Sequence, residues 1–74
     1  MSTVKKRSVS LSGHRTSYSV EDEFLEILKT MAEAQSIPLA RLISQIDAER
    51  SRDTNLSSAL RLAALAHLKS GNQN

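Results

Sequence analysis

The sequence predicts a mainly α-helical protein in which one short N-terminal strand precedes three helices. A short alternation of polar and apolar residues indicates the strand, and three stripes of apolar residues at helical spacing follow it. The strand finds no convincing partner in its own chain, and a lone strand cannot pair its backbone polar groups. We therefore expect it to pair antiparallel with the same segment of a second copy, in a homodimer. The alternation consists of Arg15, Ser17, Tyr18, Ser19 and Val20.

The size and composition of the chain also favour a dimer. The chain has 74 residues, no cysteine, one tyrosine and one phenylalanine. A chain of this size buries only about 60% of the surface exposed by its unfolded form, and many such chains depend on disulfides, metals or oligomerisation. The absence of cysteine excludes disulfides and thiolate metal sites, so oligomerisation is the expected support.

Two types of membrane-directed segment are missing from the sequence. Its longest apolar run is far below the roughly 18 residues of a membrane span. The opening residues lack the apolar core of a secretion signal. We expect no membrane association and a cytoplasmic location.

Charge is distributed unevenly along the chain. Residues 1–20 contain Lys5, Lys6, Arg7 and Arg15 without any acidic residue, whereas residues 21–74 contain six basic and all eight acidic residues. Such asymmetry is expected of a chain whose first part meets a polyanion. A basic terminus that is merely solvated is the alternative, and the composition leaves it open.

Residues 1–14 are predicted to form a flexible basic arm, because serines and Gly13 interrupt any periodic pattern. Val9 and Leu11 do alternate with serines, so a second strand over VSLS competes with this interpretation. That segment ends at Ser12-Gly13 and leads to no helix, which favours the arm. His14 is interpreted as an ordinary polar loop residue.

Three helices are predicted after the strand. The first runs from Glu21 to near Ser36 and begins with three acidic residues, which the helix dipole favours. The second starts at Ile37-Pro38 and reaches about Glu49. Their apolar stripes and the strand should supply a dimer core made of Tyr18, Val20, Phe24, Leu28, Leu42, Ile43 and Ile46.

The third predicted helix is apolar on more than one side. Thr54 or Asn55 can cap its start, and Leu62 and Leu65 lie off its main apolar face. Such a helix must be buried against something, which indicates a dimer or a protein partner at the C-terminal helix. The predicted organisation is an arm over 1–14, a folded domain over 15–70 and a polar tail over 71–74.

The order strand, helix, short connection, helix over residues 15 to about 48 resembles the ribbon-helix-helix family of bacterial repressors, which includes the Arc, Met and plasmid copy-number repressors. Arg15, Ser17 and Ser19 match the outward strand positions of that family, and Tyr18 and Val20 match its buried ones. The segments SGHRTSYSVEDEF and NLSSALR look like a short bacterial group of the family with an extra C-terminal helix.

This resemblance implies a sequence-specific regulator of transcription that binds double-stranded DNA. Two strands from two subunits would enter the major groove as a ribbon. Arg15, Ser17 and Ser19 would contact bases, with Arg15 donating two hydrogen bonds to guanine. Lys5, Lys6, Arg7 and Arg41 would contact phosphates.

The second helix departs from the family pattern at its start. The family commonly has a glycine there and a small polar cap whose backbone amides hold a phosphate, whereas Ser36 and Pro38 occupy this neighbourhood here. Pro38 removes one amide donor, so Arg41 could reach a phosphate instead. A solvated Arg41 is the alternative.

Two other function classes compete with a DNA-binding regulator. The strand could serve dimerisation only, and the chain would then be an antitoxin or another protein-interaction module that uses its C-terminal helix. An enzyme is disfavoured, because the sequence shows no nucleophile paired with a base, no glycine-rich phosphate loop and no metal-ligand spacing. No cofactor is expected.

Overall fold

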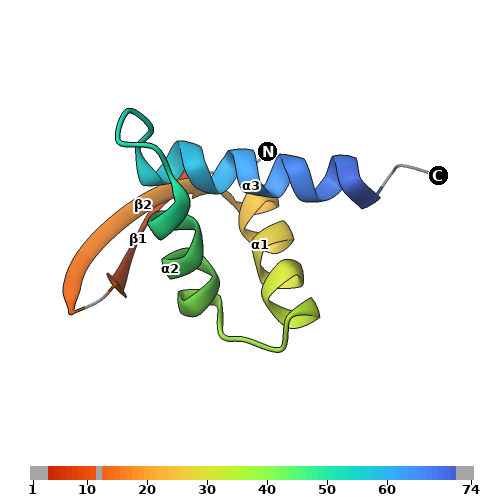
Figure 1. Cartoon of the computed structure of the whole chain (residues 1–74), viewed down its shortest axis with the longest axis horizontal. Coiled ribbons are helices and arrows are strands. Elements are labelled where there is room, and N and C mark those ends of the chain that lie inside the picture. The colour runs from red at the N-terminus through yellow and green to blue at the C-terminus, as the bar shows by residue number, and fades with distance from the viewer. Residues whose placement is uncertain (1–3, 12, 72–74) are drawn as a thin grey trace.

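The computed structural model describes residues 4–11 and 13–71. The ends of the predicted arm and tail, residues 1–3 and 72–74, lie outside the described residues, as does Ser12. A two-stranded antiparallel sheet precedes three helices, as Figure 1 shows. The elements are β1 (Val4–Leu11), β2 (His14–Glu21), α1 (Asp22–Ala34), α2 (Leu39–Glu49) and α3 (Leu56–Gly71).

Strand β1 corrects two predictions, the flexible arm and the lack of a partner strand within the chain. It pairs antiparallel with β2 along its whole length, from Val4 opposite Glu21 to Leu11 opposite His14. Gly13 has a φ of +82°, a value that glycine adopts without strain in a tight turn. The two strands are adjacent in sequence, so closing the hairpin costs little chain entropy. The strand predicted for residues 15–20 is therefore one half of an intramolecular hairpin.

Helices α1 and α2 lie side by side, and α3 crosses the end of this pair that lies near the sheet (Figure 1). The side chains of Val20, Leu28, Ile43 and Leu60 are fully buried where the sheet and the helices meet. Five of the predicted core residues are buried in this single-chain core, and Phe24 and Ile46 pack against it partly exposed. Their predicted role in a dimer core stays a prediction.

Helix α1 ends in a left-handed turn made by a serine. Ser36 has a φ of +57°, and its N–H donates to the Glu33 carbonyl at 3.0 Å. The Ile37 N–H donates to the Ala32 carbonyl at 3.0 Å, which completes a common helix-terminating pattern. Ser36 thus takes the conformation usually left to glycine, and Pro38 precedes the first residue of α2 instead of occupying it.

Helix α3 has two differently packed halves. Asn55 caps its start, because the side-chain oxygen of Asn55 accepts a 2.8 Å hydrogen bond from the Ser58 N–H. Buried residues run from Leu56 to Ala64, and every residue from Leu65 to Gly71 is exposed. No helix in the described part of the chain combines the length and the apolar character needed to cross a bilayer.

Candidate nucleic-acid interface

The hairpin turns one polar face away from the helices. Alternation along β2 sends Tyr18 and Val20 into the core and the residues between them to the other side. Cross-strand partners share a face, so β1 adds its own residues to that side. We call this side the outer face; it consists of Lys6, Ser8, Ser10, Arg15, Ser17 and Ser19.

The outer face unites the three predicted base contacts with two residues that the sequence analysis missed. Ser10 lies opposite Arg15, and Ser8 lies opposite Ser17. Arg15, Ser8, Ser10 and Ser17 are exposed. The alternation of VSLS was the signal for Ser8 and Ser10, because it has the same period as the alternation in β2.

The predicted phosphate contacts are divided between the two faces of the hairpin. Lys6 lies on the outer face, whereas Lys5 and Arg7 lie opposite the buried Val20 and Tyr18. The Arg7 guanidinium pairs with the Asp22 carboxylate at 3.6 Å, and its Nε atom is buried without a hydrogen-bond partner. Arg7 is therefore tied to the start of α1 and separated from Lys6.

Tyr18 lies opposite Arg7 and connects Arg7 to the core. Burial raises the pKa of the Tyr18 hydroxyl, and the positive charge of Arg7 partly offsets that rise. The ring is almost completely buried, so it anchors the inner face of the hairpin on the helices.

Helix α3 bonds, at Ser19, to the edge of β2 that faces away from β1. The Ser19 N–H donates to the Ser57 hydroxyl at 2.8 Å, and Arg61 donates to the Ser19 carbonyl oxygen at 3.0 Å. Arg61 also donates from Nε to the Glu21 carboxylate at 3.0 Å. Ser57 and Arg61 therefore position the end of the outer face, although neither was predicted as a functional residue. Both belong to the segment NLSSALR.

The outer face has a positive balance. Lys6 and Arg15 contribute two cations, and the acidic residue at its end, Glu21, is paired with Arg61. The hydrogen bond from Arg61 lowers the pKa of the Glu21 carboxyl below its ordinary value, so this carboxylate stays ionised and neutralised by its partner. No group of three or more His, Asp or Glu side chains among residues 4–11 and 13–71 could hold a metal ion.

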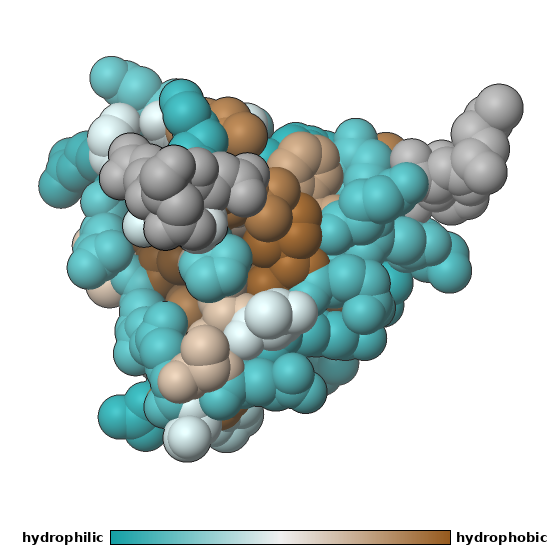
Figure 2. All heavy atoms as spheres, turned by 90° about the vertical axis from the view of Figure 1, so that its right-hand side faces the viewer, coloured by the Kyte–Doolittle hydropathy of each residue, from teal (hydrophilic) through white to brown (hydrophobic). Residues whose placement is uncertain are grey.

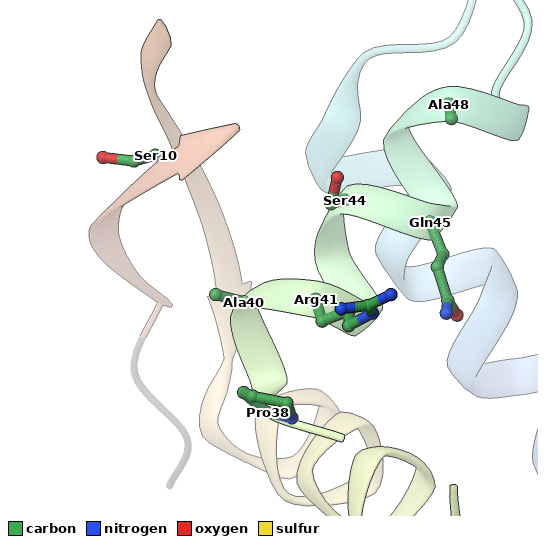
Figure 3. Close-up of a pocket in the computed structure, with 7 residues that line it drawn as sticks. All are labelled: Ser10, Pro38, Ala40, Arg41, Ser44, Gln45 and Ala48. Carbon is green, nitrogen blue, oxygen red and sulfur yellow. The ribbon is translucent and has the colours of Figure 1, made fainter. Parts of the chain in front are cut away.

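Arg41 lies apart from the outer face, in the first turns of α2. It is exposed and borders an open groove between α2 and the β1 residue Ser10 (Figure 3). The side chain of Ser10 points away from α2. Arg41 can therefore meet a polyanion only beside the hairpin, not on it.

We expect the Glu21–Arg61 pair to stabilise the fold in a pH-dependent way. A carboxyl whose pKa is lowered on folding contributes stability above its unfolded pKa, near 4.5, and loses that contribution as the pH falls through the lowered value. Glu21→Gln should therefore lose less stability than the wild type between pH 7 and pH 3. Urea unfolding at several pH values measures this difference. Glu23→Gln, on the exposed side of α1, is the matched control, and equal acid sensitivity of wild type and Glu21→Gln would contradict the expectation.

Comparison with known proteins bears on this geometry. A family model described as a ribbon-helix-helix domain matches residues 4–68, which include both strands, α1, α2 and most of α3. No curated protein and no solved structure matched the chain. Domains of this family bind DNA as regulators or antitoxins, and they dimerise. The match spans most of the sequence, so this chain belongs to the ribbon-helix-helix domain family.

Proposed function

We propose that this protein is a sequence-specific, repressor-like regulator in the bacterial cytoplasm that binds DNA as a homodimer. The observation that carries the proposal is the outer face, where two cations and four serines stand on one side of an antiparallel ribbon. The ribbon that enters the major groove is the β1–β2 hairpin of one chain. Antiparallel pairing of two β2 strands from two copies stays a prediction.

The dimensions and chemistry of the hairpin suit the major groove. The groove is about 12 Å wide and admits a two-stranded ribbon. Arg15 can donate two hydrogen bonds to O6 and N7 of one guanine. Ser17 and Ser19 contact neighbouring base edges, where a hydroxyl can donate or accept. Serine therefore discriminates weakly between bases, and Arg15 carries most of the direct readout.

Phosphate contacts supply affinity that does not depend on sequence. Lys6 reaches the backbone from the outer face, and Lys5 and Arg41 reach it from beside the hairpin. Arg7 contributes least to such contacts, because a phosphate would have to displace its ion pair with Asp22.

A second candidate function rests on the exposed end of α3. Figure 2 shows apolar atoms gathered on the side of the molecule toward which α3 ends. Leu62, Leu65 and Leu68 are large exposed apolar residues of that helix. An antitoxin or interaction module would use them to bind another protein. This function would be favoured if a second polypeptide co-purified with the wild type but not with Leu65→Asn. The wild type would in that case also fail to bind promoter DNA.

Arg15→Ala should weaken binding to a DNA site selected by the protein from a random pool. Loss of one bidentate base contact costs about 1–3 kcal/mol, or roughly five- to 150-fold in affinity. Binding to random DNA should fall much less. Gel shifts on both DNAs measure the two losses.

Lys29→Ala is the matched control for that experiment. It removes one positive charge from α1, where the Lys29 Nζ atom lies 3.5 Å from the Glu26 carboxylate. Affinity for the selected site should be close to that of the wild type. If Arg15→Ala lost equal affinity on selected and random DNA, Arg15 would be a phosphate contact and not a base contact.

The salt dependence of binding should report the phosphate contacts. Three cations per chain give about six phosphate contacts per dimer, so log affinity against log salt concentration should have a slope near −5. Lys6→Ala should make this slope less negative by about 2, because each dimer loses two phosphate contacts. A wild-type affinity that hardly changes with salt would exclude the proposed roles of Lys5, Lys6 and Arg41.

A further inference from the structure

The turn end of the hairpin brings together a guanidinium and a hydroxyl that the fold itself does not use. Ser10 on β1 lies directly opposite Arg15 on β2, and both are exposed on the outer face. The Ser10 side chain points away from α2 (Figure 3). Among the described residues, no carboxylate pairs with Arg15 and no hydrogen bond occupies the Ser10 hydroxyl. Both groups are therefore available to a ligand.

Ser10 differs in this respect from serines that hold the fold. The Ser57 hydroxyl accepts a hydrogen bond from the Ser19 N–H at 2.8 Å, and the Ser51 hydroxyl accepts one from the Asp53 N–H at 3.1 Å. These hydroxyls are engaged with backbone amides. The Ser10 hydroxyl instead stands beside the one arginine of the outer face.

The position of this pair in the strand ladder brings its side chains close together. In an antiparallel ladder, pairs that exchange backbone hydrogen bonds alternate with pairs whose backbone groups point outward. Ser19 directs its N–H and its carbonyl oxygen to α3, so Ser19 and Lys6 form a pair of the second kind. Ser10 and Arg15 lie four residues along the same ladder and are therefore of the same kind. The Cβ atoms of such a pair are about 4.5–5.5 Å apart.

This spacing suits the two bases of one base pair viewed from the major groove. The strands of a ribbon are about 4.8 Å apart, so a ribbon lying along a groove of about 12 Å places one strand beside each DNA strand. Guanine presents two acceptors, O6 and N7, and its cytosine presents the N4 amino group as a donor. Arg15 can only donate, whereas the Ser10 hydroxyl can accept. The two side chains together complement both bases of a G·C pair.

We infer that Ser10 is a specificity-determining residue that reads one G·C pair together with Arg15. Arg15 contacts the guanine, and the Ser10 hydroxyl accepts a hydrogen bond from N4 of the cytosine. This inference rests on the proposed function, in which the hairpin enters the major groove. It gives β1 a part in base reading, which that function otherwise assigns to β2 alone.

The reading has a direction, because the two strands of the hairpin carry different residues. Reversal of the base pair places the cytosine amino group beside Arg15, where two donors meet. Positions on one face of a strand recur about every 6.8 Å, which is about two steps of base pairs stacked roughly 3.4 Å apart. Ser8 and Ser17, the next pair on the outer face, therefore lie over a different base pair.

A cycle of substitutions in protein and DNA tests the contact between Ser10 and the cytosine. Selection from random DNA by the wild type and by Arg15→Ala locates the G·C pair, because the variant loses its preference there. Ser10→Ala should bind the wild-type site about two- to tenfold more weakly, as expected for one hydrogen bond between neutral groups. The cytosine is then replaced by N4-methylcytosine, which still pairs with guanine but carries a methyl group in place of the N–H that faces the groove. The wild type should lose affinity for this DNA, and Ser10→Ala should bind it no more weakly than the wild type does.

Ser8→Ala is the matched control, because Ser8 is also an exposed β1 serine on the outer face. Any affinity that it loses should be the same on methylated and unmethylated DNA, since Ser8 lies over another base pair. Both serines are exposed, so the fold should persist in each variant, as circular dichroism can verify.

The outcomes distinguish this reading role from the proposed function. Equal affinity of the wild type and Ser10→Ala for the selected site would overturn the role of Ser10 and leave DNA binding by the hairpin standing. An equal loss from Ser10→Ala on methylated and unmethylated DNA would overturn it too, because Ser10 would then contact a group other than N4. A wild type that selects no DNA sequence would overturn the proposed regulator and the reading role with it.

Discussion

The engagement of both edges of β2 is the constraint on which the rest of the structure depends. Along one edge β2 pairs with β1, and at the other edge Ser19 bonds to Ser57 and Arg61 of α3. These contacts pair the backbone of β2 along the edge toward β1 and hold the other edge at Ser19. They also fix which side of the ribbon faces the helices. The polar outer face and the buried inner face both follow from this placement.

The separation of the two faces sorts the basic residues into different roles. Lys6 and Arg15 stand on the outer face beside serines, and the Glu21 carboxylate at the end of this face is paired with Arg61. Arg7, one residue from Lys6, turns inward to Asp22 because strand neighbours point to opposite sides. A run of three basic residues thus yields two exposed lysines and one arginine that pairs with the start of α1. Composition alone cannot make this distinction.

Helix α3 has two halves whose packing differs. Its first half holds the edge of β2 and closes the core through Leu60 and Ala64. Its second half projects with exposed leucines. Members of the ribbon-helix-helix family bind DNA and dimerise, and the family match includes most of α3.

Local residue patterns by themselves determined the family, the existence of the strand that became β2, the three helices and most of the core. Tyr18, Val20, Leu28 and Ile43 are buried as their spacing predicted, because period and apolar character suffice to choose the buried face of a strand or helix. Only the tertiary structure decided that residues 4–11 form a strand. Lys5, Lys6 and Arg7 carry no apolar signal, and their extended conformation comes from hydrogen bonding to β2.

The tertiary structure likewise decided that the two-stranded ribbon forms within one chain. It also decided that Ser57 and Arg61 bond to the edge of β2 that faces away from β1. Those contacts join residues about 40 positions apart in the sequence. Sequence periodicity describes which face of an element is apolar, but it does not specify which element lies against it. That choice depends on the packing of all five elements together.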